Sequence, residues 1–353
     1  MKETRMAAHN AQGSATAFSL ADFESSQVQQ FGLARLGQDG IVFILAAILF
    51  VLFAITLQGF LTVENLLSLV RNVSILGVLG LGMAVVVIGR GIDLSITATM
   101  SMCAAWVLVL TGQGTSLGVA LLYGAALAVV FGLISGVLIA YVEIPPLFAT
   151  LAMSSAIYGL GRLKLVESDS NYLTQGAEPL RMLGGGEFLG VPSPIVMLAT
   201  LSVLAYLVLR FTKFGRFVYS VGDNLAAARI AGIAVRPLTV ALYVVTAMVA
   251  FIAGLVTAGV VGEVHTRLVG STLVYDVILV VALGGISLSG GKGSVRNVIA
   301  GTLLIGIMLN GMTILNVSFT QQNIVKGLIL LAAIVADSLV NPRDEQTSRQ
   351  GDI

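Results

Sequence analysis

Charged residues are scarce in this chain of 353 residues: 10% are Asp, Glu, Lys or Arg, while 57% are hydrophobic. A soluble domain contains about 25% charged residues, so this sequence has too few charges to cover a water-exposed surface. The lipid bilayer is the natural solvent for such a composition. The formal net charge of +1 gives no electrostatic reason to bind a polyanion. We therefore expect a membrane protein that contacts lipid and has no nucleic-acid partner.

Cysteine and histidine are nearly absent as well. The only cysteine, Cys103, cannot form an intrachain disulfide, and its apolar surroundings favour a small buried side chain. The two histidines, His9 and His265, belong to no His/Asp or Cys/His cluster that the sequence makes apparent. We therefore expect neither a metal site nor a catalytic residue in this chain.

Polar residues are concentrated at the two ends of the chain. Residues 1–39 are rich in Ser, Gln and Ala, and they lack the short apolar core and cleavage site of a signal peptide. Residues 341–353 have a similar polar character. Both segments are expected to be disordered tails, which flank a membrane domain at 40–340.

Apolar segments divide this central region into ten candidate membrane helices. A spanning helix needs roughly 20 mostly apolar residues, and the segments at 147–160 and 273–283 are shorter than that. A polar loop at 161–193 separates the fifth segment from the sixth. The predicted fold is an all-α, polytopic membrane protein whose segments are 41–57, 66–88, 94–110, 117–142, 147–160, 194–209, 238–261, 273–283, 298–315 and 324–339.

The distribution of Lys and Arg predicts the orientation of the chain. Cytoplasmic loops carry an excess of these residues, and an even number of spans places both termini on one side. Four of these residues, Arg162, Lys164, Arg181 and Arg267, lie on the opposite side. The side with the termini collects Lys2, Arg5, Arg35, Arg90, Arg210, Lys213, Arg216, Arg229, Arg236, Lys292, Arg296, Arg343 and Arg349. The sequence therefore predicts cytoplasmic termini, with the loop at 210–236 on the same side.

A glycine-rich stretch, ALGGISLSGGKGS at 282–294, has the composition of a phosphate-binding loop. A Walker A loop requires Gly-x-x-x-x-Gly-Lys-Ser/Thr, but Ile286 replaces the first glycine and Gly293 follows Lys292. The dinucleotide pattern Gly-x-Gly-x-x-Gly also fails, because Arg296 stands at its last position. Nucleotide binding by this stretch is therefore disfavoured.

The same stretch is better explained as a tight turn between two membrane helices on the cytoplasmic side. Glycine adopts positive φ readily, and the residues predicted to form the turn are Gly284, Gly285, Gly290, Gly291 and Lys292. A related string, VIGRGIDLS at 87–95, also lies at the cytoplasmic end of a span. This similarity hints at an internal repeat of the kind that transporters contain.

Ionisable residues within or beside the spans are few. Arg71 and Lys326 lie near span ends, where long side chains can extend to the membrane interface. Asp93 precedes a helix that its carboxylate could cap. Asp276 lies inside an apolar segment, so it should face protein or a cavity. Because such acids are sparse, the sequence gives little support to an ion-coupled carrier.

Four strings occur in order along the chain: GFLTVENLLSLVRNVSILGVLGLGMAVVVIGRGIDLS (59–95), IPPLFATLAMSSAIYGLGR (144–162), GRFVYSVGDNLAAARIAGIAV (215–235) and ALGGISLSGGKGSVRNVIAGTLLIGIMLNGMTILNVSFTQQNIVKGLILLAAIVAD (282–337). Together they resemble the permease subunits of ribose-type ABC sugar importers, which are related to the branched-chain amino acid permeases. The resemblance extends over roughly 40–340. It implies a type II ABC importer permease bundle in the bacterial plasma (inner) membrane.

The resemblance also implies which partner subunits complete the importer and which of them bind ATP. A second permease copy or homologue, two cytoplasmic ATPase subunits or one fused tandem ATPase, and an extracytoplasmic sugar-binding protein would complete the importer. ATP and Mg would bind to the ATPase subunits, and this chain would hold no cofactor and catalyse no reaction. Its substrate would be a monosaccharide or related polyol.

A short cytoplasmic helix at 221–232 matches the family segment that docks on the ATPase. Alanines favour the helix, Asp223 or Asn224 can cap it, and Arg229 can pair with an acid of the partner. The coupling residues are Gly222, Asp223, Asn224, Ala226, Ala227, Ala228, Arg229 and Gly232. The candidates for lining or gating the solute pathway are Asn72, Asp93, Asp276 and Asn310.

Two departures from the family leave the substrate open. The family often shows Tyr-Glu-Leu-Asp where this chain has Leu273, Val274, Tyr275 and Asp276, and its usual Thr-Gly-Gly-Ile-Asp-Leu-Ser-Val-Gly-Ser reads IGRGIDLSITA here. Import of branched-chain amino acids or nucleosides by a related permease is one alternative. A standalone ion-coupled carrier is another, and a membrane enzyme is a more remote one.

Overall fold

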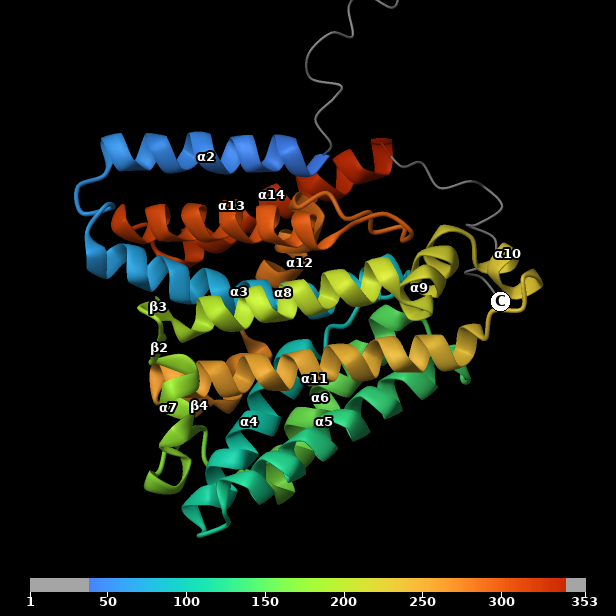
Figure 1. Ribbon diagram of the computed structural model, residues 1–353, viewed down its shortest axis with the longest axis horizontal. Helices are drawn as coiled ribbons and strands as arrows, with labels where there is room; N and C mark the ends of the chain where they lie inside the picture. Colours follow the sequence, from blue (N-terminus) through green and yellow to red (C-terminus); the bar gives the residue numbers. More distant parts are fainter. Residues whose placement is uncertain (1–37, 341–353) are drawn as a thin grey trace, which may run out of the picture. The chain divides into compact units, whose positions relative to one another are not determined.

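The structure, a computed structural model, describes residues 38–340, and Figure 1 shows the arrangement of the helices. Of the tails predicted at 1–39 and 341–353, residues 1–37 and 341–353 lie outside the described residues, and Gln38 and Asp39 differ from the prediction because they begin the first described helix. Ten longer helices account for the predicted apolar segments: α2 (Gln38–Thr56), α3 (Val63–Ile88), α4 (Ile96–Gly112), α5 (Leu117–Ala140), α6 (Pro146–Lys164), α8 (Ser193–Phe211), α11 (Val235–Val261), α12 (Leu273–Leu283), α13 (Val295–Ile314) and α14 (Phe319–Val340).

Each predicted segment falls on one of these helices, so the all-α polytopic fold is confirmed. Within 38–340, six helices are long and apolar enough to cross a membrane: α2, α3, α5, α8, α11 and α13. Helices α4 and α12 and the apolar part of α14 are apolar but shorter. The prediction placed the start of the last segment at 324, but α14 begins at Phe319 because polar residues there continue the helix.

Proline and glycine mark several helix ends. Ile144 and Pro145 lie between α5 and α6, and Pro146 is the first residue of α6, where the missing N–H has no intrahelical partner to lose. Gly262 ends α11 in the left-handed conformation, with φ of +80°. These residues divide the apolar sequence into separate helices, which composition alone would leave joined.

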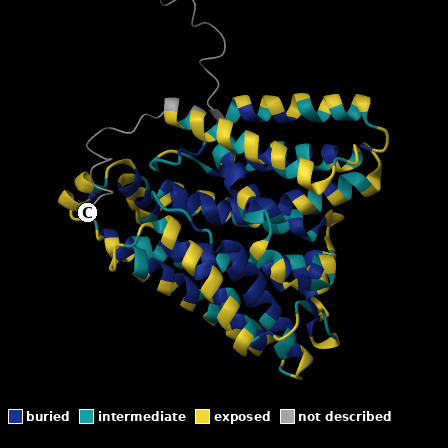
Figure 2. Cartoon of the chain, turned by 180° about the vertical axis from the view of Figure 1, so that it is seen from behind, coloured by how far each residue is buried: buried dark blue, intermediate teal, exposed yellow. Residues whose placement is uncertain are grey.

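Helix α3 lies at the centre of the bundle and α2 at its margin. In the most apolar window of α3, 83% of residues are buried, against 11% in α2. Figure 2 shows exposed residues along the whole of α2, as expected for a helix that faces lipid. Most of α3 therefore packs against other protein segments, whereas α2 faces the bilayer.

Small residues bring α5 and α11 into close contact. A Cβ at Gly132 would lie 2.7 Å from Val244 Cα, and one at Gly136 would lie 2.6 Å from Val240 Cα. Apolar helices gain no hydrophobic free energy by associating in lipid, so close backbone approach and dispersion must hold them together. Gly132 and Gly136, four residues apart on one face of α5, permit this close approach.

The polar loop at 161–193 contains several short elements. Strand β1 (Ser170–Tyr172) pairs in antiparallel fashion with β4 (Glu263–His265), and β2 (Glu187–Phe188) pairs with β3 (Val191–Pro192). The remaining elements of this end are η1 (Gln175–Ala177), α7 (Pro179–Gly184) and η2 (Thr266–Gly270). All of these elements lie at the end of the helices opposite α9 (Lys213–Asp223) and α10 (Leu225–Ile230) (Figure 1).

Candidate functional site

The predicted coupling segment is divided into two helices. The sequence led us to expect one helix at 221–232, but α9 ends at Asp223 and α10 begins at Leu225. The break occurs at Asn224, which has an extended backbone and whose Oδ1 accepts a hydrogen bond from Ala227 N at 2.9 Å. Asn224, one of the two expected capping residues, therefore caps α10.

Helix α10 presents a small exposed surface. Ala226, Ala227, Arg229 and Ile230 are exposed, and Ile230 is 89% accessible. Ala228 is buried and belongs to the core, and the half-buried Leu225 packs against that core. An exposed isoleucine beside small side chains and an arginine is suited to fit a groove on another protein. Gly232 follows with φ of +79° and turns the chain toward α11.

Three backbone segments meet immediately beneath this surface. The N–H of Gly291 donates to Ile88 O at 2.9 Å. A Cβ at Gly222 would collide with Ile88 O and would lie 2.5 Å from Gly291 N. The end of α9, the end of α3 and the loop between α12 and α13 are therefore in backbone contact, and only glycine fits at position 222. We call this contact of Gly222, Ile88 and Gly291 the glycine junction.

The stretch 284–294 forms the predicted turn between α12 and α13. Gly285, Gly290 and Gly291 have φ of +85°, +91° and +73°, and Ser287 N donates to Lys292 O at 3.2 Å. Gly284 differs from the expectation, since its φ is −61°. Glycine is needed at position 284 because there is no room for a side chain: a Cβ there would lie 2.8 Å from Val280 O.

Side chains attach this turn to two further helices. Tyr219 of α9 donates its hydroxyl to Gly293 O at 2.8 Å. Burial raises the pKa of Tyr219 above its usual value, although Arg210 acts in the opposite direction, so the hydroxyl keeps its donor proton at neutral pH. Asp337 of α14 accepts from Leu288 N at 3.1 Å. The turn therefore links α9 with α12, α13 and α14.

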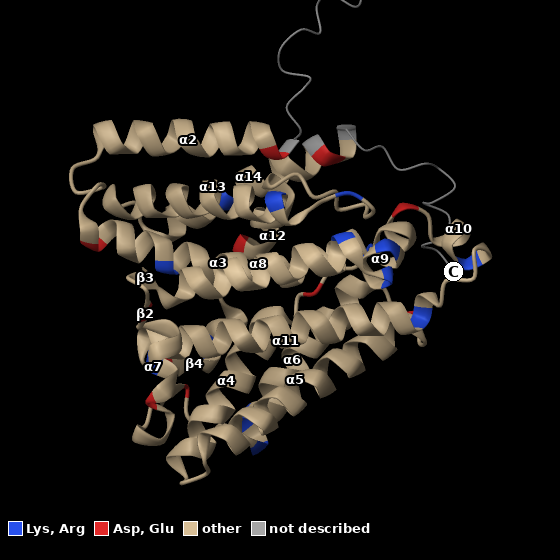
Figure 3. Cartoon of the chain, viewed as in Figure 1, with Lys and Arg blue, Asp and Glu red and all other residues tan. Residues whose placement is uncertain are grey.

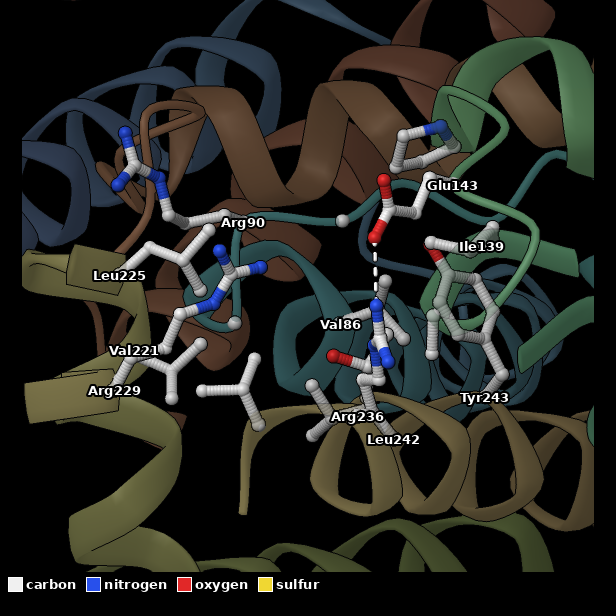
Figure 4. A pocket seen from close by; sticks show the side chains of 16 residues that line it. Val86, Arg90, Ile139, Glu143, Val221, Leu225, Arg229, Arg236, Leu242 and Tyr243 are labelled. Atoms are coloured by element: carbon white, nitrogen blue, oxygen red, sulfur yellow. Dashed lines mark hydrogen bonds and ion pairs between the residues drawn. The ribbon is translucent and has the colours of Figure 1, made fainter. Parts of the chain in front are cut away.

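Basic residues gather at this end of the helices, around α9 and the adjoining end of α11 (Figure 3). A pocket of about 350 Å³ lies there and is lined by Arg90, Arg229 and Arg236 together with Glu143. Arg236 Nη2 lies 2.9 Å from Glu143 Oε1, as Figure 4 shows, and its guanidinium stacks over Tyr141. The Arg236–Glu143 pair could not be predicted from the sequence, because its members lie 93 residues apart.

A second group of polar residues lies toward the opposite end of the helices. Asn72, Asp276 and Asn310, three of the four candidate pathway residues, line one groove of about 380 Å³ between α3, α12 and α13. Asn310 exchanges two hydrogen bonds with Asn65, at 2.8 and 3.0 Å. Sequence reasoning missed Asn65, whose partner lies 245 residues away.

The fourth candidate, Asp93, lies apart from this groove, in the connection between α3 and α4. It is 3% exposed, and its Oδ1 accepts from Ser95 N at 2.9 Å and from Ser95 Oγ at 2.6 Å. Neighbouring backbone is held by Thr150, whose Oγ1 accepts from Leu94 N, and by Tyr243, whose hydroxyl donates to Ile92 O. The carboxylate of Asp93 thus binds Ser95, the residue that precedes α4, rather than the N–H groups of the first turn that a cap would satisfy.

The expectation for Lys326 is wrong. Its ammonium does not extend to an interface: the residue is 5% exposed, and Nζ lies 2.8 Å from Asp276 Oδ1. Nζ also donates to Thr272 Oγ1 at 3.3 Å. Asp276 does face protein and a cavity, as expected. Two buried opposite charges in contact lower the desolvation cost that either would carry alone.

His265 has neighbours in the β1–β4 ribbon that the sequence did not reveal. Across the β1–β4 ribbon, His265 Nδ1 lies 3.0 Å from Ser170 Oγ, and Nε2 lies 3.0 Å from Glu263 Oε1. Residues 170 and 265 are register partners, which explains the contact between distant segments. His265 is exposed on this short ribbon, and Ser170 and Glu263 are half-buried. Among residues 38–340, no group of three or more His, Cys, Asp and Glu could hold a metal ion.

Comparison with known proteins assigns the chain to a family. Residues 65–334 match the family model described as "Branched-chain amino acid transport system / permease component". This match extends over α3 to α14 and includes the groove, the glycine junction and α10. The chain belongs to this permease family.

Two of the relatives of this permease are named as sugar transport proteins. It is 34% identical to the ribose import permease of Bacillus subtilis (strain 168) over 292 residues, 82% of this chain and 89% of the relative. It is 32% identical to the L-arabinose transport system permease protein of Escherichia coli (strain K12) over 309 residues, 87% and 92% of the two chains. A probable ABC transporter permease protein of the same strain is 31% identical over 343 residues, 95% and 100%.

No solved structure matches the permease. The two regions of functional interest, α10 with the glycine junction and the groove between α3, α12 and α13, lie at opposite ends of the same helices.

Proposed function

We propose that the chain is the membrane-spanning permease subunit of an ATP-driven, binding-protein-dependent importer for a monosaccharide or related polyol. The observation that carries this proposal is the exposed, capped helix α10, held on the glycine junction, in a chain of the permease family. A solute carrier that works alone has no need for such a helix. The names of the ribose and L-arabinose relatives support the substrate class.

The proposed mechanism uses α10 as the contact with an ATPase. ATP with Mg would bind and be hydrolysed on two cytoplasmic ATPase subunits or one fused tandem ATPase. Closure of the ATPases would displace α10, and the glycine junction would pass this displacement to α3 and to the α12–α13 turn, because backbone in direct contact cannot yield independently. A second permease copy or homologue and an extracytoplasmic sugar-binding protein complete the proposed importer.

The orientation follows from the same proposal. The excess of Lys and Arg near α9 and α10 supports a cytoplasmic position for that end. Both termini would then be cytoplasmic, and the loop at 161–193 would face outward in a bacterial inner membrane. Binding protein would approach this outer end, where the groove between α3, α12 and α13 also lies.

Uptake by the reconstituted importer tests the proposal. Vesicles with the permease, its ATPases and its binding protein should take up sugar only with ATP. Truncation of the docking side chain in Ile230→Ala should lower uptake at least fivefold, because exposed anchors contribute most of an interface's affinity. Ile55→Ala is the matched control, since Ile55 is similarly exposed, at 80% against 89%, but on the lipid-facing α2. Equal uptake by the two variants would refute the coupling role of α10.

Two alternatives have distinct outcomes in the same system. A permease for branched-chain amino acids or nucleosides would work with a binding protein that retains one of those molecules, so melting shifts of the cognate binding protein across solutes decide the class. An ion-coupled carrier would import solute without ATPases, and uptake would stop when the ion gradient is collapsed.

A further inference from the structure

Polar side chains from three helices converge on the groove between α3, α12 and α13. Its volume of about 380 Å³ lies within the range of small-molecule sites. The lining combines three amides, two hydroxyls and one carboxylate in segments that are otherwise strongly apolar. These polar residues are Asn65, Ser68, Asn72, Asp276, Asn310 and Thr313.

The depth of this groove is the first reason to assign it a ligand. Asn72 lies nine residues from the start of α3, which is about 14 Å along the axis of a 26-residue helix. Its side chain is nevertheless exposed, as is that of Ser68. By contrast, the exposed large residues at comparable depth in α2 are all apolar, for example Ile48 at 59% and Leu52 at 50%. An exposed amide at this depth needs a polar neighbour, because hydrocarbon offers no hydrogen bond.

The charge of the groove is the second reason. Asp276 is the only ionisable side chain in its lining, and Lys326 Nζ lies 2.8 Å from Asp276 Oδ1. The charge is therefore balanced within the protein. Amides and hydroxyls both donate and accept hydrogen bonds, and a carboxylate accepts them. Such a wall matches a neutral solute that carries several hydroxyl groups.

The amide pair of Asn65 and Asn310 gives the groove a rigid end. Asn65 Nδ2 also donates to Phe60 O at 2.8 Å, so the pair holds the start of α3 against α13. Both amides are occupied with each other. The other polar side chains that line the groove are left to contact a solute: Ser68, Asn72, Thr313 and Asp276.

We propose that this groove is a solute-contacting site of the permease, which accepts a neutral polyhydroxylated molecule through Ser68, Asn72, Asp276 and Thr313. The inference rests on the proposed function, to which it adds a site. A branched-chain amino acid would bring an ammonium and a carboxylate with it. The groove has no uncompensated charges to bind that ammonium and carboxylate. An aliphatic side chain would also leave the polar groups of the groove without hydrogen-bond partners.

Thiol accessibility in the complete importer tests the site. The only native cysteine is Cys103, which is fully buried, so introduced thiols can be followed in an otherwise unreactive chain. Asn72→Cys should react with a membrane-impermeant methanethiosulfonate, and a saturating mixture of D-ribose, L-arabinose and D-xylose, delivered by loaded binding protein, should slow the reaction at least threefold. Ile48→Cys is the control at matched depth, because Ile48 lies eight residues before the end of α2, the end that leads to the start of α3. This thiol should remain unreactive.

Two outcomes of the thiol experiment would overturn the inference. If Asn72→Cys resists the reagent as Ile48→Cys does, the groove faces lipid or protein and the inference is overturned. If it reacts but none of the sugars slows the reaction in a transporting importer, the groove is wet but touches no solute, and the inference is also overturned.

Uptake by paired threonine variants separates this inference from the proposed function. Thr313 and Thr56 each lie in the last turn of a helix, are exposed, and donate their hydroxyls to the carbonyl four residues earlier. Thr313→Val should lower sugar uptake at least threefold, and Thr56→Val should not. Absence of ATP-dependent sugar uptake in the unaltered importer would refute the proposed function itself. Normal uptake by Thr313→Val, in an importer that works, would refute only the groove.

Discussion

At the scale of single residues, glycine 222 has a role that no other residue type can fill. It lies against backbone atoms of two other segments, Ile88 and Gly291, and backbone cannot move aside as a flexible side chain can. The glycine-rich turn at 284–294 is thus not a nucleotide loop but one part of the junction that supports α10. Its glycines are needed for positive φ at some positions and for close approach at others.

The substitution Gly222→Ala should therefore be costly. Overpacking of this kind destabilises by about 1–3 kcal/mol, and more where backbone must move. We expect a lower melting temperature for the purified permease in detergent and weaker ATP-driven uptake. Gly118→Ala in α5 is the control, because a Cβ there meets nothing within 4 Å. Equal melting temperatures for the two variants would contradict the junction.

The buried pair of Lys326 and Asp276 gives a second prediction at this scale. Lys326→Met leaves an uncompensated buried carboxylate, and breaking such a pair costs about 3–5 kcal/mol. The double variant Lys326→Met/Asp276→Leu removes both charges, so it should melt at a higher temperature than Lys326→Met alone. Thermal melting of the purified variants in detergent measures the order of their melting temperatures. A double variant less stable than the single one would show that the two charges do not act on each other.

At the scale of elements, α10 is too short to be stable by itself. A helix of six residues has few internal hydrogen bonds and pays the full cost of nucleation. It forms because Asn224 caps its start and because Ala228 packs on the core beneath it. The exposed side of the helix is thereby presented in a fixed orientation.

Loss of the cap should weaken coupling without unfolding the membrane helices. Asn224→Ala removes the acceptor for Ala227 N, which costs about 1 kcal/mol and shifts the local equilibrium about fivefold toward an unwound segment. We expect lower ATP-driven uptake at an unchanged melting temperature. Asn224→Asp retains a capping oxygen and should keep nearly full uptake. If both variants transport equally, the cap is not needed for coupling.

At the scale of the whole permease, the two functional regions are separated along the length of the bundle. Helix α10 and the glycine junction lie at one end, and the groove lies toward the other (Figure 1). Between them run α3, α12 and α13, which contact both regions. These three helices are therefore the connection through which a displacement of α10 would reach the groove.

Orientation in the membrane can be measured with single thiols. Glu178→Cys, in the outer loop, should react with an impermeant maleimide in intact cells, because that residue is exposed. Ala226→Cys, on α10, should react only in inside-out vesicles. The reverse pattern would place α10 outside and exclude an intracellular ATPase as its partner.

The sequence allowed the helices to be predicted well because apolar length and helix breakers are local properties. Proline and glycine lie at the boundaries of helices: Pro146 begins α6, and Gly262 follows the end of α11. The capping residue of α10 was likewise one of two adjacent candidates. The break between α9 and α10 was not foreseen, because it depends on the extended backbone that packing imposes at Asn224.

Side-chain partners could be predicted much less well. Asp276 was singled out because an acid in an apolar segment must face protein, and its position in a groove agrees with that reasoning. Its partner was not found: Lys326 lies 50 positions away, and only the packing of α12 against α14 brings the two charges together. For the same reason the sequence could not show the Asn65–Asn310 pair or the contacts of His265.

The sequence by itself determined the solvent, the fold class and the family of this protein, because composition, apolar length and local motifs are all written in order along the chain. Only the tertiary structure decided which polar groups share a groove and which glycines form the junction. The physical reason is distance: hydrogen bonds and ion pairs act over a few ångströms, and residues far apart in the chain come that close only once the helices have packed.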